Sequence, residues 1–132
     1  MKNKKKILVD MSATLLHHGH IRLLKKADKL GKVIVALTKD SEIKKYKKYK
    51  PELNFKHRKE ILKSIKYVHK VIPSNYYITE RLLKKYKINL LIHGSDNKNS
   101  ISKSKLIIYK RTKSISSTIL RKKACKCLKK SK

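Results

Sequence analysis

The pattern that most constrains the fold is a pair of short apolar runs separated by an amphipathic segment. Residues 33–37 read Val-Ile-Val-Ala-Leu, and a run that is apolar at every position is typical of a parallel strand with both faces covered. Residues 7–9 form a shorter run of the same kind. Between the two runs, residues 21–30 place apolar side chains at helical spacing, and Gly31 stands where a helix C-cap glycine belongs. Residues 7–37 therefore predict one strand–helix–strand unit.

The same alternation continues along the chain. It predicts three more strands, at 68–72, 90–92 and 106–109, and three more helices, at 55–65, 78–86 and 116–128. We expect Pro73 to close the third strand and residues 41–51 to form a loop or a frayed helix. The expected fold is α/β, a Rossmann-like, doubly wound parallel five-stranded sheet flanked by helices. In such a sheet the ligand lies at the carboxyl ends of the strands, so we expect a site in the segments 10–20, 38–51, 73–77, 93–99 and 110–118.

The composition adds a strong positive charge. The 132 residues contain 38 Lys and Arg against 8 Asp and Glu, which gives a formal net charge of +30. Such a charge attracts polyanions, so non-specific polyanion binding is expected. Most of the basic residues are lysines spread along the whole chain. That distribution favours a generally basic surface over a dedicated nucleic-acid groove, which would combine arginines with aromatic platforms.

The apolar runs are too short for a membrane-spanning helix, which needs about 20 apolar residues. The basic start of the chain leads into an apolar run that is also too short for a signal peptide. The two cysteines, Cys125 and Cys127, do not supply a disulfide framework or a zinc site with four cysteines. We therefore expect a cytoplasmic protein without a membrane span.

A histidine cluster follows the first predicted strand. His17 and His20, with Gly19 between them, stand at the expected start of a helix. A helix start carries unpaired N–H groups and a partial positive charge that attract anions, and Gly19 allows a ligand to approach the backbone closely. Two imidazoles three residues apart share one face of the first turn and can donate to phosphate oxygens. The alternatives are a polar cap on the helix and, less favoured, a zinc site, for which no cysteine or carboxylate stands at ligand spacing.

Several segments, in order along nearly the whole chain, resemble one enzyme superfamily. Residues 17–20 resemble the HxGH signature of the nucleotidyltransferases. The segments similar to glycerol-3-phosphate cytidylyltransferases are His57–Leu62, Ile65–Pro73, Gly94–Asp96 (Gly-Asp-Asp in that family) and Arg111–Thr118 (RTxxISTT in that family). By this resemblance we expect a cytidylyltransferase-like nucleotide-binding domain over residues 1–120 and a basic C-terminal helix end or tail over residues 121–132.

The resemblance implies an enzyme of the nucleotidyltransferase class. It implies transfer of CMP from CTP to a small phosphorylated alcohol, with glycerol 3-phosphate as the first candidate, to give a CDP-linked product and pyrophosphate. The acceptor phosphate would attack the α-phosphate directly, so that positioning and charge stabilisation supply the catalysis. Mg²⁺ would be bound with CTP and not by a protein metal site. A homodimer is also expected from the family.

The resemblance also implies roles for individual residues. The implied catalytic residues are His17, His20, Lys47 and Arg111. The implied nucleotide-binding residues are Ser12, Ala13, Gly19, Gly94, Asp96, Arg111, Thr112, Ile115, Ser116, Ser117 and Thr118. The implied acceptor-binding residues are Lys47 and Arg58. The lysines that compete with Lys47 for the role in its loop are Lys44, Lys45, Lys48 and Lys50.

The chain departs from the family pattern at several positions. Thr14 replaces an acidic residue, and Ser114 replaces a glycine. Ser95 and Asn97 replace an aspartate and a tryptophan. Residues 11–13, Met-Ser-Ala, resemble more closely a branch that acts on phosphonates. The sequence therefore does not identify the acceptor, which is a phosphate ester, a phosphonate, choline phosphate or a flavin nucleotide. It also does not distinguish CTP from ATP as the nucleotide.

One alternative comes from a different functional class. The net charge, the basic end of the chain and the loss of the acidic residue at Thr14 are compatible with a nucleic-acid-binding module that no longer catalyses a reaction. This alternative predicts tight RNA binding that weakens steeply with salt. It also predicts that CTP does not stabilise the protein.

Overall fold

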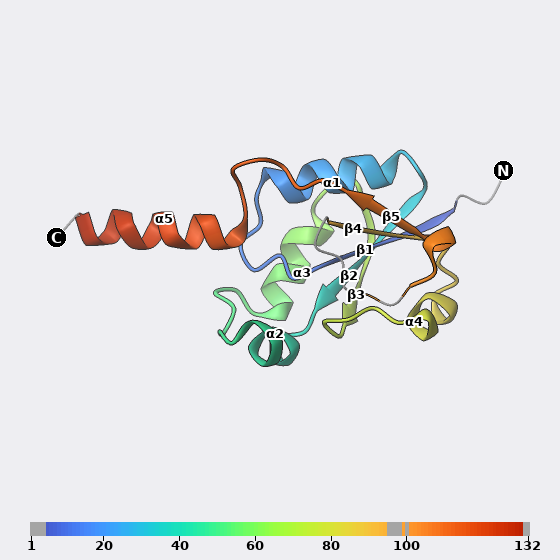
Figure 1. Ribbon diagram of the computed structural model, residues 1–132, viewed down its shortest axis with the longest axis horizontal. Coiled ribbons are helices and arrows are strands. Elements are labelled where there is room, and N and C mark those ends of the chain that lie inside the picture. The colour runs from blue at the N-terminus through green and yellow to red at the C-terminus, as the bar shows by residue number, and fades with distance from the viewer. Residues whose placement is uncertain (1–4, 95–98, 100, 131–132) are drawn as a thin grey trace.

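The computed structural model describes residues 5–94, 99 and 101–130. One sheet of five parallel strands has the order β3-β2-β1-β4-β5 (Figure 1). The strands are β1 (Lys6–Met11), β2 (Lys32–Thr38), β3 (Val68–Ser74), β4 (Leu90–Gly94) and β5 (Leu106–Tyr109). The chain starts at the centre of the sheet, adds β2 and β3 on one side, and then returns to add β4 and β5 on the other. The predicted Rossmann-like, doubly wound parallel sheet is confirmed.

Helices cover both faces of the sheet. The described helices are α1 (His18–Asp28), α2 (Asp40–Lys47), α3 (Phe55–Lys63), α4 (Glu80–Lys85) and α5 (Ser117–Lys130), with a short 3-10 helix at Lys103–Lys105. Of these, α5 does not cover the sheet. Successive side chains of a strand point to opposite faces. Val9 therefore packs in one core with Leu24 of α1 and Leu62 of α3, whereas Leu8 packs in a second core with Leu83 of α4. Burial on both faces is the reason that the middle residues of the central strands, 7–9 of β1 and 33–37 of β2, are all apolar.

The third strand is longer than predicted. It continues through Pro73 to Ser74, which pair with Leu37 and Thr38 of β2. The prediction that Pro73 closes the strand is therefore wrong. β3 lies at the edge of the sheet and pairs with β2, and an edge strand tolerates a residue without an N–H group.

Residues 41–51 are more regular than expected, because most of them belong to α2. Asp40 and Glu42 lie in the first turn, where negative charge stabilises a helix, and Ile43 is fully buried. The helix ends at Lys48, which adopts the left-handed conformation with a φ of 64°. Lys47 is therefore the last helical residue.

Gly31 does not cap a helix. α1 ends at Asp28 with Lys29 as its C-cap, and no described glycine has a positive φ, so the predicted C-cap role is wrong. A Cβ at Gly31 would lie 2.2 Å from the carbonyl oxygen of Lys5, which accepts a hydrogen bond from the N–H of Lys32. Gly31 is needed because two backbone segments approach each other closely there.

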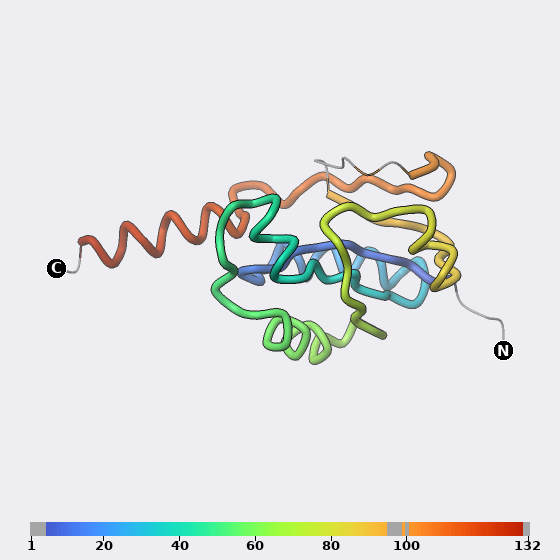
Figure 2. The backbone as a smooth tube through the Cα atoms, turned by 90° about the horizontal axis from the view of Figure 1, so that it is seen from below, coloured from blue at the N-terminus to red at the C-terminus, as the bar shows by residue number. Residues whose placement is uncertain are grey.

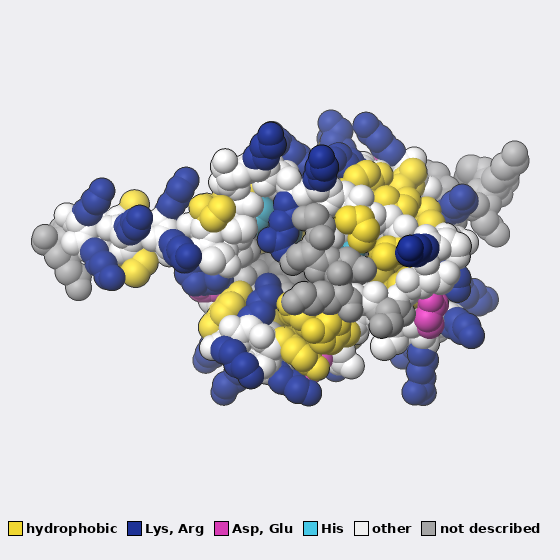
Figure 3. Space-filling view, in the orientation of Figure 1, with side chains coloured by type: hydrophobic (Ala, Val, Ile, Leu, Met, Phe, Trp, Pro, Cys, Tyr) yellow, Lys and Arg dark blue, Asp and Glu magenta, His cyan; other side chains and the backbone are white. Residues whose placement is uncertain are grey.

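The last helix extends away from the body of the protein (Figures 1 and 2). None of the residues described for α5 is buried, and the boundary expected at residue 120 falls inside this continuous helix. Lys and Arg side chains are spread along α5 and over the rest of the face seen in Figure 3, without gathering into one patch. Within the described part of the chain, no helix is both long enough and apolar enough to cross a membrane.

Candidate active site

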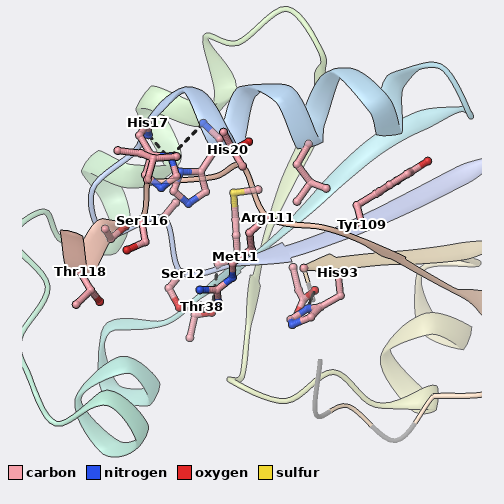
Figure 4. A pocket seen from close by; sticks show the side chains of 18 of the residues that line it. Met11, Ser12, His17, His20, Thr38, His93, Tyr109, Arg111, Ser116 and Thr118 are labelled. Carbon is pink, nitrogen blue, oxygen red and sulfur yellow. Dashed lines mark hydrogen bonds and ion pairs between the residues drawn. The ribbon is translucent and has the colours of Figure 1, made fainter. Parts of the chain in front are cut away.

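A cavity of about 370 Å³ lies at the carboxyl ends of the strands. The residues predicted from the sequence that line it are Ser12, Ala13, His17, Gly19, His20, Lys47, Gly94, Arg111, Thr112, Ile115, Ser116, Ser117 and Thr118. Asp96 lies outside the described residues, as do Ser95 and Asn97. In the view of Figure 4, the side chains of His17, His20, Ser116 and Thr118 lie at one end of this cavity, and His93 lies toward the other.

Hydrogen bonds at the start of α1 orient two histidines. His17 is the N-cap, and its Nδ1 accepts a hydrogen bond of 3.0 Å from the N–H of Gly19. Nδ1 of His20 accepts a bond of 3.2 Å from the N–H of His17. Because Nδ1 is an acceptor in both rings, each neutral imidazole carries its proton on Nε2. The ring centroids are 4.0 Å apart, so the two rings offer a pair of neighbouring Nε2–H donors.

The surroundings of the two rings favour their neutral form. Burial lowers the pKa of His20 to about 3, with further contributions from His17, Lys47 and Arg111. Burial also lowers the pKa of His17, again with help from neighbouring positive groups. At neutral pH the two imidazoles are therefore uncharged donors, and the positive charge beside them comes from Lys47 and Arg111.

Space and backbone conformation are tightly constrained around the histidines. A Cβ at Gly19 would lie 2.8 Å from Cε1 of His17, so a larger residue would push the capping ring aside. Ala13 and Ser114 both have left-handed backbone conformations, with φ values of 47° and 63°. Such a φ favours glycine, which explains why the family pattern has a glycine at the position of Ser114.

A second helix start borders the same cavity. Ser116 caps α5, because its Oγ accepts a hydrogen bond of 3.0 Å from the N–H of Ile119. Oγ of Ser117 donates a bond of 3.0 Å to the carbonyl oxygen of Leu15, which ties the start of α5 to the segment that precedes α1. The cavity is thus bordered by two helix starts, each with unpaired N–H groups that attract anions.

An arginine holds the first turns of α5 against the domain. Arg121 donates to both carboxylate oxygens of Glu52, and its Nη2 lies 3.2 Å from Oγ1 of Thr14. Its guanidinium also lies 4.3 Å from the ring centre of Tyr49. Thr14 is the position where the family pattern has an acidic residue. In this chain Glu52 supplies the carboxylate that pairs with Arg121, and the hydrogen bond from Arg121 lowers the pKa of Glu52.

Of the five lysines considered for the loop after β2, Lys47 lines the cavity. Its charge is one of the causes that lower the pKa of His20. Lys44, Lys45, Lys48 and Lys50, all of them described, do not line it. Of these five lysines, Lys47 is therefore the one that the structure places at the cavity.

Arg58 has a different place from the one expected. Its side chain is 1% exposed, and its guanidinium donates to the carbonyl oxygens of Leu53, Ser12 and Thr38 and to Oδ1 of Asp40, at 3.0, 2.7, 2.9 and 2.5 Å. It does not line the cavity, so the prediction that it contacts the acceptor is wrong. The buried charge is satisfied by these oxygens, and its bonds hold Ser12 and Thr38, which do line the cavity.

Other lining residues were not singled out from the sequence. They include Asp10, Tyr49, Tyr76, Tyr77, His93, Asn99, Tyr109 and Lys110. Asp10, His93 and Tyr109 lie at the carboxyl ends of β1, β4 and β5, and the other five follow the strands. This is the edge where a parallel sheet places its ligands. That rule identifies the segments, but no motif distinguishes these residues from their neighbours.

Comparisons with known proteins agree with this geometry. The family model described as cytidylyltransferase-like matches residues 13–123. Glycerol-3-phosphate cytidylyltransferase of Staphylococcus aureus is 30% identical over 119 residues, which cover 86% of this chain and 90% of that protein. The protein of the same name from Bacillus subtilis is 31% identical over 119 residues, which cover 86% of this chain and 92% of its own.

A solved structure shares the fold. The lipopolysaccharide core biosynthesis protein from Thermoplasma volcanium superposes with a TM-score of 0.68 at 20% identity, over 84% of this chain and 98% of that one. The family match covers the cavity from Ala13 to Thr118, including both helix starts. The chain belongs to the cytidylyltransferase-like family.

Proposed function

We propose that the protein transfers CMP from CTP to a small phosphorylated alcohol, with release of pyrophosphate and formation of a CDP-linked product. The observation that carries the proposal is the convergence of two helix starts on one cavity. The start of α1 brings His17 and His20, the start of α5 brings Ser116–Thr118, and Lys47 and Arg111 add positive charge. This is a donor set for a polyphosphate.

The reaction follows from the placement of these donors. An oxygen of the acceptor phosphate bonds to the α-phosphorus while the bond to the β-phosphate oxygen breaks, and pyrophosphate leaves with the electron pair. The acceptor oxygen is already anionic, so no base has to remove a proton. Nε2–H groups of His17 and His20 donate to the phosphates as charge shifts toward the leaving group, and Lys47 and Arg111 balance that charge. Each such donor typically contributes about 10²- to 10³-fold to the rate.

Mg²⁺ is proposed to enter with the nucleotide. Among the described residues, no group of three His, Cys, Asp or Glu side chains is placed to hold a metal ion. The cavity offers mainly N–H and hydroxyl groups, which fit a metal already coordinated by phosphate oxygens and water. When bound, the ion would neutralise negative charge on the leaving pyrophosphate, whereas the protein side chains position the reacting groups.

Glycerol 3-phosphate is the first candidate acceptor, because relatives that match over most of their length carry that substrate in their names. A phosphonate, choline phosphate and a flavin nucleotide are the other candidates. A homodimer, which the family resemblance implies, belongs to the same proposal. Light scattering of the purified protein checks it through the molecular mass.

The test is pyrophosphate release in the presence of Mg²⁺, with CTP and ATP run in parallel against a panel of phosphorylated and phosphonate acceptors. We expect release with CTP and at least one acceptor, lost in His20→Ala and retained in His57→Ala, since His57 is exposed on α3 and does not line the cavity. Release with ATP alone would overturn the cytidine assignment. Absence of release with every pair would overturn the transfer reaction itself.

A further inference from the structure

A second cavity lies at the edge of the sheet opposite the active-site cavity. It has a volume of about 420 Å³ and is lined by residues from the amino-terminal parts of β1, β2 and β3 and from the end of α4. Figure 1 shows β1 running from this edge toward the side of α5, so the two cavities lie at opposite ends of the strands. No described residue lines both of them.

Positive charge dominates the lining of the second cavity. Five of its residues are lysines, which come from three strands and from the end of α4, namely Lys6, Lys32, Lys70, Lys85 and Lys87. No described Asp or Glu lines this cavity, and none of the five lysines forms an ion pair within the described part of the chain. The charge that gathers here is therefore not neutralised by those residues.

The register of the sheet places three of the lysines on one face. Lys6 of β1 pairs with Lys32 of β2, and Lys70 of β3 pairs with Ile34, two residues after Lys32. Paired residues of neighbouring strands point to the same face, as do residues two apart in one strand. Like charges in neighbouring positions of a sheet repel each other and cost stability. An anion bound between these side chains would offset that cost.

The floor of the second cavity is apolar and belongs to the core. Ile34 is buried in the core on the side of α4, and Tyr86 packs against the same core. The ammonium nitrogens of Lys70 and Lys85 lie 5.7 and 5.4 Å from the centre of the Tyr86 ring. One half-buried ring thus attracts cations from β3 and from α4, which holds both ammonium groups at the cavity.

A helix dipole explains only part of this arrangement. The end of a helix carries a partial negative charge that favours nearby cations, which accounts for Lys85 and Lys87 at the end of α4. Lys6, Lys32 and Lys70 belong to strands, where no such dipole stabilises them. The lysines of the strands therefore lack a local partner that would explain why they gather.

The chemistry of the lining indicates the class of ligand. Among the described residues no arginine lines the second cavity, so its charges are ammonium points without the planar fork of a guanidinium. A groove for nucleic acid would also need open aromatic rings on which bases stack. Tyr86 is half-buried, and two ammonium groups already approach its ring. Separate ammonium groups around a small cavity suit several linked phosphate groups without bases.

We propose that the second cavity binds a compact polyphosphate, an anion made of a few linked phosphate groups, and that its five lysines neutralise the charge of that anion. This binding does not depend on the proposed transfer reaction. Inorganic triphosphate and the triphosphate group of a nucleotide share the required chemistry, and the experiment separates these two sources.

The test is acetylation of the wild-type protein with and without inorganic triphosphate, with the modification of each lysine measured by mass spectrometry of peptides. It is run at about 0.15 M salt, which screens charges more than about 8 Å apart. Saturating triphosphate should slow acetylation of the five lysines about tenfold, because a bound anion favours the ammonium form, which does not react. Lys56 and Lys63, exposed lysines of α3 that line neither cavity, should change less than about twofold.

A parallel series with CTP identifies the source of the phosphate groups. CTP that protects the five lysines as strongly as triphosphate assigns the second cavity to a nucleotide. CTP that protects Lys47 in the active-site cavity and leaves the five lysines reactive assigns it to an inorganic polyphosphate. Both results support a polyphosphate site.

Two double variants of equal net charge show whether position matters. Lys32→Gln with Lys70→Gln should raise the triphosphate concentration that half-protects Lys85 about 10-fold or more, since two contacts to a charged group are lost. Lys56→Gln with Lys63→Gln should leave it within about twofold. Thermal unfolding without the anion should show the first variant to be at least as stable as the second, because the change removes repulsion.

Three results would overturn the proposed site. Equal weakening in the two double variants, or equal protection of the lysines of α3, would show that the anion binds the basic surface as a whole. Protection confined to the active-site cavity would show that the second cavity binds no polyphosphate. Protection of the five lysines by a single-stranded RNA and not by triphosphate would assign the site to nucleic acid. Each of these results leaves the transfer reaction standing, because pyrophosphate release measures that reaction separately.

Discussion

The two helix starts that border the cavity are supported in different ways. α1 is anchored by buried Leu24 and Ala27, and its first turn is closed by bonds from the backbone to His17 and His20. α5 contributes no buried residue over its described length. Its start is held by Ser117 and by Arg121, whose partners are the half-buried Leu15, the exposed Glu52 and the buried Thr14.

We therefore call the half of the site at α1 preformed, because it does not depend on a ligand. We call the half at α5 conditional, because its position depends on a bound nucleotide. The core fixes α1 whether or not a ligand is present, so the histidines are already oriented. The Arg111–Thr118 segment depends on a few polar contacts, each of which contributes little free energy when exposed to solvent. We therefore expect a nucleotide to order the start of α5 and to leave α1 nearly unchanged.

The largest effect is expected on the preformed side. His20→Ala removes an oriented Nε2–H donor and should lower kcat about 10²- to 10³-fold. His18→Ala, which changes the exposed neighbour on the same turn, should stay within about twofold of wild type because no catalytic contact is lost. Steady-state pyrophosphate release measures both. Equal activity of His20→Ala and His18→Ala would contradict the role given to the start of α1.

On the conditional side, Arg111→Ala should act mainly on nucleotide binding. The loss of hydrogen bonds from a charged donor to phosphate predicts a rise in KM for CTP of about 10- to 100-fold. Arg111→Lys should recover only part of the affinity, because lysine keeps the charge without the planar pair of donors. Calorimetric titration with CTP measures the affinities directly. If the wild type and Arg111→Lys bind CTP equally well, Arg111 does not make a forked contact with a phosphate.

The burial of His20 predicts a pH effect on stability. Its pKa falls from 6.5 to about 3 in the folded protein, so below pH 6.5 the unfolded chain takes up a proton that the native state does not. Above pH 6.5 this group does not change the free energy of unfolding. Below pH 6.5 it should lower the free energy of unfolding by about 1.4 kcal/mol per pH unit. Denaturant unfolding from pH 7 to pH 4 should give a steeper loss for wild type than for His20→Gln. Parallel curves would show that folding does not lower the pKa of His20.

The smallest effect is expected where α5 is tied to the domain. Arg121→Gln breaks an exposed ion pair that is worth about 0.2–1 kcal/mol, so KM for CTP should rise only a few-fold. Lys122→Gln removes the same charge one residue later and serves as the control. Exchanging the partners, with Arg121→Glu and Glu52→Arg in one protein, should bring the KM back toward wild type. If Lys122→Gln and Arg121→Gln have the same KM for CTP, the ion pair does not position α5.

The sequence was informative where local pattern and global fold agree. The apolar runs and the helical spacing between them predict the sheet, because the middle of a strand buried on both faces is made of apolar residues. The HxGH and RTxxISST segments predict the phosphate end of the cavity, and the structure brings them together from opposite ends of the chain. Both predictions depend on residues close together in the sequence.

The failures came from contacts that depend on the tertiary structure. Arg58 lies at the spacing of Leu62 on the inner face of α3, but its charge favoured an exposed position, and only the four oxygens around it explain its burial. Ile61 of the same helix is apolar and yet 39% exposed, so residue type alone does not identify the inner face. The contact between the side chains of Asp10 and His93, which both line the active-site cavity, follows from the adjacency of β1 and β4, which the spacing of residues along the chain does not reveal.

The central claim, that one nucleotide bridges a preformed and a conditional helix start, is tested most directly by amide hydrogen exchange with and without CTP and Mg²⁺. The account predicts that CTP slows exchange strongly over residues 111–120 and changes it little over residues 21–28, which the core already protects. Slowed exchange confined to α1, or no change in either segment at saturating CTP, would contradict it.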